Sequence, residues 1–442
     1  MKTGDFMTTS VKVNPEKHNM VPYYLVVFYM FLEFGRPQNL IPYLNYLHLP
    51  AITVLTMGLF ILISHKFSLK SKQTLFFFLI MCEMVIHGPI AVNNYWAFQM
   101  FYVMSITFIA YVGIITYVDT YWKYENLIKF WVMTFILLAF VGMRHKGSGV
   151  GGFMGDENDF CMALNMILPF AIFGVFMDKS RSYKVYCVIL TCLFLFVIAL
   201  TNSRGGFVGL LSVVAYCVFK SNKKAILLLL ISVFAIFLYL VAPSGYWREM
   251  GTISEETSQK DEKLQQQVGT GAQRIYSWKL GWGMFLDNPI LGVGQGNYPW
   301  NVIEQEEKMG ILWKTRSLGG RAAHSLYFTL LSELGLVGTV LFSLIIIYIW
   351  KDLKRVRAVI NQKGFTDKKL KTNIHYNTLA IEASVIGFMA SSVFISTLYY
   401  PSIWLLTGIM VALKNIVMGY QVNTVQEEPS RYSAFNYKTT YN

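Results

Sequence analysis

The sequence carries little charge. Aspartate, glutamate, lysine and arginine make up 14% of its 442 residues, whereas a soluble domain carries about 25%. The polar surface that a soluble fold needs is therefore missing. Apolar residues make up 54% of the chain and come in blocks of about 17–25 residues, long enough to cross about 30 Å of hydrocarbon as helices. The composition predicts an all-α, polytopic bundle of transmembrane helices.

Three other features are absent. The alternating pattern of about ten residues that marks transmembrane β-strands does not occur, which excludes an outer-membrane barrel. The five cysteines all fall in apolar blocks, and their odd number supports neither a disulfide framework nor a cysteine-rich metal site. No small-residue cleavage site follows the apolar run from Val21, so no cleavable signal peptide is predicted.

About twelve spans are predicted. They divide the chain into residues 1–242 with spans one to nine, a large loop at 243–323, residues 324–418 with spans ten to twelve, and a polar tail at 419–442. The twelve segments are 22–34, 50–64, 74–90, 97–118, 127–142, 160–177, 184–200, 204–219, 225–242, 324–350, 378–397 and 401–418.

The charges predict the orientation of these spans. The net charge is +13, and most of the lysines and arginines fall on the face that holds both termini and the 351–377 loop. The positive-inside rule places that face in the cytoplasm and the 243–323 loop on the outer face. Orientation and contact with anionic membrane lipids explain the basic residues without nucleic-acid binding.

The 243–323 loop is too long for a simple connection. It contains five tryptophans, and residues 271–287 show helical apolar spacing. We therefore expect short amphipathic helices that lie along the membrane surface. The polar stretch 254–263 matches no recognisable feature and could shape a binding site.

Three basic residues on the outer face are candidates for chemistry. Arg204 lies in a short turn between two spans, where it either extends to lipid headgroups or clamps an anion, with Gly205 and Gly206 letting a ligand approach the backbone. Arg274 opens the 271–287 stretch and is either a solvated charge or a second anion ligand. His324 begins a span. It is either a capping residue or a base, because a helix N-terminus keeps an imidazole neutral at pH 7.

Other polar residues give weaker signals. The acidic cluster 156–159 could supply oxygen ligands to Ca²⁺ or Mg²⁺, but helix capping explains it as well, and no metal site is predicted. The glycines of 292–296 follow no βαβ strand, so this segment is expected to be a flexible turn. Glu33, Glu83 and Glu382 could suggest a proton relay, but no arginine or lysine inside the membrane is expected to pair with them.

The order of motifs resembles the bacterial O-antigen ligase/polymerase family, whose members transfer glycans from undecaprenyl diphosphate on the periplasmic face of the inner membrane. The resemblance covers most of 150–345, and the single motifs are weak, whereas their order is distinctive. The motifs are Gly155-Asp-Glu-Asn158, Ser203-Arg204-Gly205-Gly206, Arg274 to Trp278 with Asp287-Asn-Pro289-Ile-Leu-Gly292-Val-Gly294, and His324-Ser-Leu-Tyr327 with Glu333-Leu-Gly335-Leu-Val-Gly338.

The resemblance implies roles for the matching residues. His324 would be the general base, and Arg204 and Arg274 would hold the diphosphate. It implies an inverting glycosyltransferase that needs no metal or other cofactor and uses an undecaprenyl-diphosphate-linked oligosaccharide as donor. Further acceptor or sugar contacts are expected from Tyr327, Trp278 and Asn158.

The acceptor and the rival functions stay open at this point. A lipid A-core, a second lipid-linked repeat unit or a protein side chain would make the protein a ligase, a polymerase or a protein O-oligosaccharyltransferase. Twelve spans are also common in transporters, although the sequence shows no internal repeat and no evident charged pair inside the spans. A non-catalytic assembly protein of an envelope complex is a third alternative, in which His324 would be replaceable.

Overall fold

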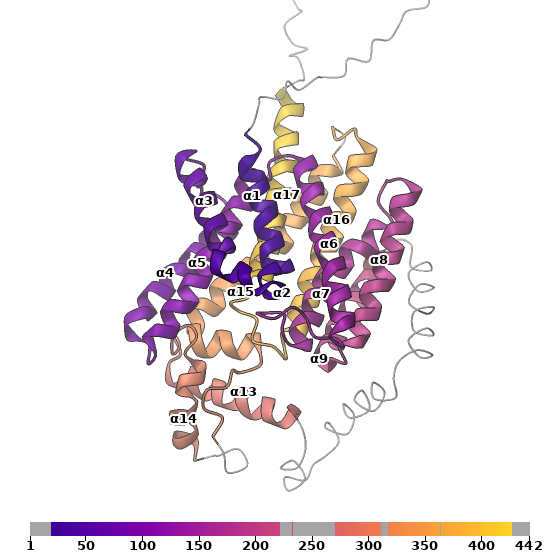
Figure 1. The fold of residues 1–442 in the computed structure, drawn as a ribbon. Helices are drawn as coiled ribbons and strands as arrows, with labels where there is room; N and C mark the ends of the chain where they lie inside the picture. The colour runs from indigo at the N-terminus through magenta and orange to yellow at the C-terminus, as the bar shows by residue number, and fades with distance from the viewer. Residues whose placement is uncertain (1–18, 222–231, 233–269, 311–316, 363, 427–442) are drawn as a thin grey trace, which may run out of the picture.

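The computed structural model describes residues 19–221, 232, 270–310, 317–362 and 364–426 (Figure 1). The described part is helical and contains no β-strand, only an isolated bridge between Gly151 and Met154. Its elements are α1 (Val21–Met30), the π-turn Phe31–Gly35, α2 (Pro37–Leu40), the 3₁₀ turn Pro42–Leu47, α3 (Leu49–Ile63), α4 (Lys72–Ile90), α5 (Asn94–Tyr117), α6 (Tyr121–Arg144), α7 (Glu157–Gly174), α8 (Arg181–Leu200), α9 (Arg204–Lys220), α13 (Thr270–Asp287), α14 (Tyr298–Met309), α15 (Leu326–Ile360), α16 (Lys368–Ser391) and α17 (Pro401–Gln426).

The helices form one bundle with a cap at one end. In Figure 1, α3, α4 and α5 form the left-hand side, α8 and α9 the right-hand side, and α7, α16 and α17 lie between them. The start of α1 and the end of α17 lie at the upper end, whereas α13 and α14 lie across the lower end. The first and last described helices thus have their outer ends on one side of the bundle, opposite α13 and α14.

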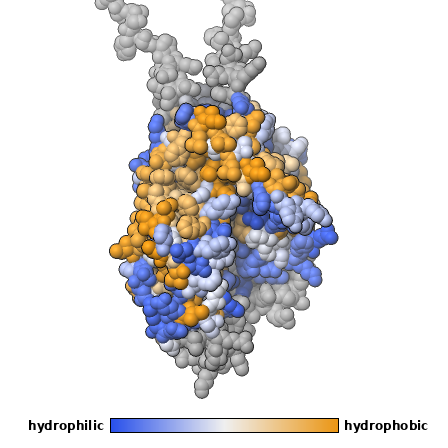
Figure 2. Space-filling view, turned by 60° about the vertical axis from the view of Figure 1, so that its left-hand side comes forward, coloured by the Kyte–Doolittle hydropathy of each residue, from blue (hydrophilic) through white to orange (hydrophobic). Residues whose placement is uncertain are grey.

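Seven helices of the described part are long and apolar enough to cross a membrane, and α1 with its π-turn forms a shorter apolar helix. These helices are apolar on their outer faces as well as inside: Leu59, Phe140 and Ile189 are about 60% exposed. Figure 2 shows apolar residues over much of the upper part of one face and hydrophilic residues gathered lower down. Lipid, rather than water, suits such a surface. The seven candidate spans are Pro42–Ile63, Lys72–Ile90, Asn94–Tyr117, Tyr121–Arg144, Arg181–Leu200, Leu326–Ile360 and Pro401–Tyr420.

The predicted helix over 271–287 is confirmed by α13, and two predicted spans need correction. The segment 378–397 is not one helix, because α16 ends at Ser391 and residues 392–400 form turns and bends that lead into α17. The segment 324–350 is broken at Gly335, where φ is 56° and ψ −152°. Most of the expected span 225–242 and the polar stretch 254–263 lie outside the described residues.

The expectation that no arginine or lysine within the spans pairs with these glutamates is wrong for Glu382, whose partner Arg357 lies on the apolar helix Leu326–Ile360. Arg36 pairs with Glu33 at 3.3 Å, and Arg357 pairs with Glu382 at 2.6 Å. The partner of Glu33 lies only three residues away, and that of Glu382 lies on another helix, α15. Spacing along the sequence does not show such an inter-helix pair. Glu83 has no ion pair in the described part of the chain.

Candidate functional site

The turn between α8 and α9 positions Arg204 at the capped end of the bundle. The Ser203 hydroxyl accepts the Gly206 N–H at 2.8 Å and so caps α9, as serine commonly does at this position. The same hydroxyl donates to the Asn158 Oδ1 atom at 2.8 Å, which links the turn to the first residues of α7. Arg204 is the first helical residue after this cap. The predicted placement of Arg204 in a short turn between two helices is confirmed.

The two glycines after Arg204 are required for a different reason from the one expected: they allow close packing of protein atoms. A Cβ atom on Gly206 would lie 2.1 Å from the Sγ atom of Cys161, and one on Gly205 would lie 3.1 Å from Phe394. Both positions are buried against neighbouring helices and turns. The interpretation that they let a ligand approach the backbone is therefore wrong, because protein atoms already occupy that space.

Aromatic side chains hold α13 against the same region. The Arg274 guanidinium lies over the Phe394 ring, 5.8 Å from its centroid, a cation–π arrangement. Trp278, one helical turn later, stacks on Phe328 with ring centroids 5.4 Å apart and lies 6.2 Å from Phe394. Phe394 thus contacts Arg274 and Trp278 on α13 and also packs against Gly205, the neighbour of Arg204.

His324 lies two residues before the start of α15, in a left-handed conformation with φ of 50°. The next helical residue, Leu326, donates its N–H to the Ser392 carbonyl at 2.9 Å. Surrounding protein displaces water from the imidazole and lowers the pKa of His324 below its usual range, and the positive charge of Arg274 lowers it further. Asp156 raises the pKa of His324 and so opposes this effect. The imidazole is therefore within electrostatic reach of both Arg274 and the start of α7.

The turn 392–400 contacts Arg274 and residues one or two positions after Arg204 and His324. It accepts the N–H of α15 beside His324, supports Arg274 through Phe394, and packs Phe394 on the glycine that follows Arg204. Sequence reasoning missed this turn, because its apolar residues continue the hydrophobic run of α16. The serines and threonine among residues 391–397, and the proline at 401, are the signals in the sequence that the span ends early.

The remaining predicted contact residues lie at the same end and make protein contacts of their own. The Tyr327 hydroxyl donates to the Met389 carbonyl at 3.0 Å. The Asn158 amide nitrogen donates to Asp156 at 2.7 Å. The indole nitrogen of Trp278 is buried and has no hydrogen-bond partner among the described residues. It is a donor still to be satisfied, since buried polar groups are almost always paired.

The acidic cluster 156–159 is used for structure. Asp156 caps α7 through the Asn158 N–H at 2.8 Å, Glu157 accepts from Ser148 at 2.9 Å, and Asp159 accepts from Tyr400 at 3.2 Å. The described residues contain no group of three or more histidine, cysteine, aspartate or glutamate side chains placed to hold a metal ion. Capping is the interpretation that fits these contacts.

A buried carboxylate joins two of the sequence motifs. Glu333, 2% exposed, accepts the N–H groups of Gly296 at 2.7 Å and Tyr298 at 3.0 Å and the hydroxyl of Tyr399 at 2.5 Å. Two residues later, helix α15 is interrupted at Gly335, where a Cβ atom would lie 2.5 Å from the Ile290 carbonyl oxygen.

Backbone hydrogen bonds also join segment 289–296 to α15 on both sides of the Gly335 break. Val293 donates to the Ser332 carbonyl at 2.8 Å, and Leu336 donates to the Pro289 carbonyl at 2.9 Å. The segment 289–296 is thus held inside the break of α15, and the expectation that it is a flexible turn is wrong. Because the break redirects the chain, the first part of α15, residues 326–334, crosses the end of the bundle beside α13 (Figure 1).

Residues 188–343 match the sequence model of a family described as O-antigen ligase. That segment belongs to the O-antigen ligase family. The match includes Arg204, Arg274, His324 and Glu333, while Asn158 and the turn 392–400 with Tyr399 lie outside it. No curated protein matches the chain. Together with the apolar helices, the family indicates a multi-pass membrane protein of polysaccharide biosynthesis, related to glycosyltransferases that act on glycans and lipid-linked substrates.

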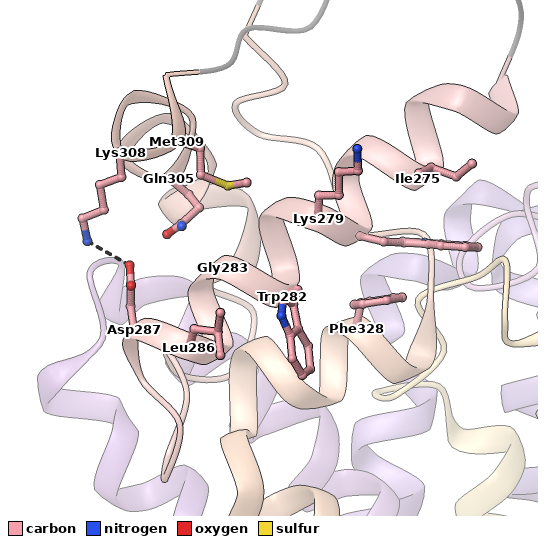
Figure 3. Close-up of a pocket in the computed structure, with 11 residues that line it drawn as sticks. Ile275, Lys279, Trp282, Gly283, Leu286, Asp287, Gln305, Lys308, Met309 and Phe328 are labelled. Atoms are coloured by element: carbon pink, nitrogen blue, oxygen red, sulfur yellow. Dashed lines mark hydrogen bonds and ion pairs between the residues drawn. The ribbon is translucent and has the colours of Figure 1, made fainter. Parts of the chain in front are cut away.

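The O-antigen ligase segment also contains a groove beside the aromatic cluster. Figure 3 shows Lys279, Trp282 and Leu286 of α13 between Gln305 and Met309 of α14 on one side and Phe328 of α15 on the other. The groove has a volume of about 570 Å³ and is mostly apolar. Lys308 and Asp287 close one end through an ion pair of 3.2 Å.

Proposed function

We propose that the protein is an inverting, metal-independent glycosyltransferase that moves a glycan from undecaprenyl diphosphate to an acceptor hydroxyl. The reaction takes place at the end of the bundle capped by α13 and α14, which we assign to the periplasmic face of a bacterial inner membrane, with both termini in the cytoplasm. The observation that supports the proposal is that the turn 392–400 contacts Arg274, through Phe394, and also Gly205 and Leu326, which lie one residue after Arg204 and two residues after His324.

Each of the three residues has a role that its surroundings support. His324 takes the proton from the acceptor hydroxyl; its lowered pKa keeps the imidazole neutral, and therefore able to accept that proton, at pH 7. The acceptor oxygen forms a bond to the anomeric carbon as the bond to the diphosphate oxygen breaks. The diphosphate leaves with the electron pair, and Arg204 and Arg274 stabilise its charge. Attack in one step inverts the anomeric configuration.

The groove in Figure 3 supports an acceptor site next to this chemistry. Trp282 is 47% exposed and lines the groove, so its ring is accessible to a sugar face. It lies one helical turn beyond Trp278, whose indole N–H is unsatisfied. We assign the groove to the acceptor. The acceptor class remains open, and the product distinguishes ligase, polymerase and protein O-oligosaccharyltransferase.

The decisive experiment is transfer by the purified protein with a defined lipid-linked oligosaccharide, candidate acceptors and a chelator. Loss of a general base lowers the rate by about 10²–10⁴-fold, so we expect His324→Ala to fall into that range. His145→Ala is the matched control, because His145 is exposed at the adjacent end of α6. Full activity of His324→Ala at normal protein level would refute the enzymatic assignment, as would movement of substrate without a new glycosidic bond, which a transporter would give.

A second pair of variants tests the anion clamp. Lysine keeps the charge of arginine but does not bind phosphate oxygens in a bidentate manner, so Arg204→Lys should reduce transfer by at least tenfold. Arg144→Lys, an exposed site at the end of α6, should leave transfer unchanged. Equal activity of the two variants would mean that Arg204 only reaches toward headgroups.

A third pair tests the acceptor groove. Loss of ring stacking in Trp282→Ala should raise the KM for the acceptor several-fold and leave the KM for the donor unchanged. Trp300→Ala is the control, because Trp300 is exposed to a similar degree on α14 but does not line the groove. If both variants behave alike, the tryptophans act as interfacial anchors and the acceptor binds elsewhere.

A further inference from the structure

A second cavity lies far from the proposed active site, between α6, α7 and α8 at the end of the bundle where α6 and α8 begin. Its volume is about 410 Å³. The walls are almost entirely apolar and include Ile128, Val132 and Ile136 of α6, Phe170 of α7 and Leu190 of α8. Tyr183 and Tyr186 of α8 line it nearer the mouth.

The mouth of this cavity carries a compact set of charges. The Lys179 ammonium donates to both oxygens of Glu125 at 2.7 Å, and Lys129 pairs with the same carboxylate at 2.5 Å. Two ammonium groups thus share one carboxylate and leave a net positive charge. Because an ammonium has three N–H donors, both lysines retain donors for a further anionic oxygen. Lys129 is also 45% exposed, so an incoming group can reach it.

Charge around the mouth is positive beyond this triad. The first turn of α8 adds Arg181 and Lys184, while the short link before it adds the acidic Asp178. Within residues 120–130 and 177–186, which border the mouth, the acidic residues are Glu125 and Asp178, and the basic ones are Lys123, Lys129, Lys179, Arg181 and Lys184. The basic groups outnumber them, so an anion is the favoured occupant of the mouth.

The sides of the cavity face the lipid-exposed surface of the bundle. Met133 and Leu137 on α6 and Val185 and Ile189 on α8 are each more than half exposed and apolar. Met133 itself lines the cavity. A ligand that is anionic at one end and apolar along its length can therefore enter sideways from the bilayer, whereas a soluble anion would leave the apolar part empty.

We propose that this cavity binds an anionic phospholipid, with the headgroup phosphate on Lys129 and Lys179 and an acyl chain between α6 and α8. Basic pockets between transmembrane helices on the cytoplasmic side are known to suit such headgroups. The site is independent of the glycosyl-transfer assignment, because it shares no residue with it. The two tyrosines sit where aromatic side chains usually meet the headgroup layer.

Native mass spectrometry of the full-length protein, released from detergent with added lipid, tests this site. The probes are phosphatidylglycerol, phosphatidylethanolamine and inorganic phosphate. We expect retention of phosphatidylglycerol in preference to phosphatidylethanolamine, and no competition from inorganic phosphate at equal concentration. Equal retention of the two lipids would overturn the proposal, and displacement of phosphatidylglycerol by phosphate would show a site for a free anion.

Two kinds of variant separate headgroup from chain. Each lysine near a membrane surface contributes about 1 kcal/mol, so Lys129→Gln with Lys179→Gln should weaken phosphatidylglycerol binding about ten- to thirty-fold. Lys66→Gln with Lys70→Gln removes the same charge from an exposed loop and should leave binding unchanged. Ile136→Trp fills the partly exposed wall of the cavity and should reduce retention of both lipids. Unchanged binding in the lysine pair, or in Ile136→Trp, would refute the assignment.

Discussion

Replacing Glu333 by glutamine should loosen the junction that redirects α15. The carboxylate is 2% exposed and accepts three hydrogen bonds, from the Gly296 and Tyr298 N–H groups and the Tyr399 hydroxyl. Glutamine keeps one acceptor oxygen but brings an NH₂ group to the other position. That NH₂ would face an N–H donor, so at least one buried backbone donor would lose its partner.

The cost follows from the hydrogen bonds that change. Hydrogen bonds to a charged acceptor contribute about 1.5–3 kcal/mol each, neutral ones about 0.5–1.5, and an unsatisfied buried donor costs about 1–3 kcal/mol. One lost bond and two weakened ones give a destabilisation of about 2–4 kcal/mol for Glu333→Gln. Because the same junction directs residues 326–334 of α15, which begin two residues after His324, glycosyl transfer should fall as well.

The assay is the free energy of unfolding in mixed micelles, measured by titration with a denaturing detergent, together with the transfer rate. A double-mutant cycle with Tyr399→Phe should give a coupling of about 1–3 kcal/mol between the two side chains. Glu304→Gln, at a carboxylate 61% exposed on α14, should stay within about 0.5 kcal/mol of the wild type. An unfolding free energy and transfer rate for Glu333→Gln equal to those of the control would refute the reasoning.

Three further outcomes are expected. Gly335→Ala should destabilise the protein by more than about 3 kcal/mol, since its φ and ψ are nearly exclusive to glycine and its Cβ atom would meet Ile290 at 2.5 Å; thermal melting in detergent measures this. Gly206→Ala should cost more stability than Gly205→Ala, whose Cβ atom has more space, by the same measurement. Transfer should fall as pH drops through the lowered pKa of His324, because protonation removes the base. The acid limb of a pH–rate profile should therefore lie below the usual histidine range, and a limb at or above it would contradict this assignment.

The sequence was a good guide to helices and to local positions within them. Apolar runs and their spacing depend on residues close together in the chain, so the α13 helix and the turn at Arg204 were predictable. The membrane-spanning character followed from composition in the same way. What the sequence could not show was where a long apolar run stops being one helix.

Both breaks that shape the candidate site depend on partners far away in the chain. At the Gly335 break, the carbonyls of Pro289 and Ile290 accept hydrogen bonds from N–H groups of α15. A Leu-Gly-Leu sequence inside an apolar run does not indicate that these distant acceptors are present. The end of α16 at Ser391 likewise coincides with the Ser392 carbonyl accepting the Leu326 N–H. Hydrophobic periodicity does not predict such contacts, because it depends on side-chain polarity. The contacts are backbone hydrogen bonds to distant residues, which replace the hydrogen bonds of a continuous helix.

The glycines beside Arg204 show the same limit at the level of single residues. A glycine that lets a ligand approach and a glycine that lets helices pack closely both occupy positions where a Cβ atom has no room. The sequence shows glycine in either case and therefore cannot distinguish the two roles. At Gly206 the excluded space is filled by Cys161, and at Gly205 by Phe394. Phe394 also carries Arg274 on its face. The glycine therefore serves the candidate site indirectly: it lets the turn 392–400 come close enough to α9 for one aromatic ring to lie between the two arginine-bearing helices.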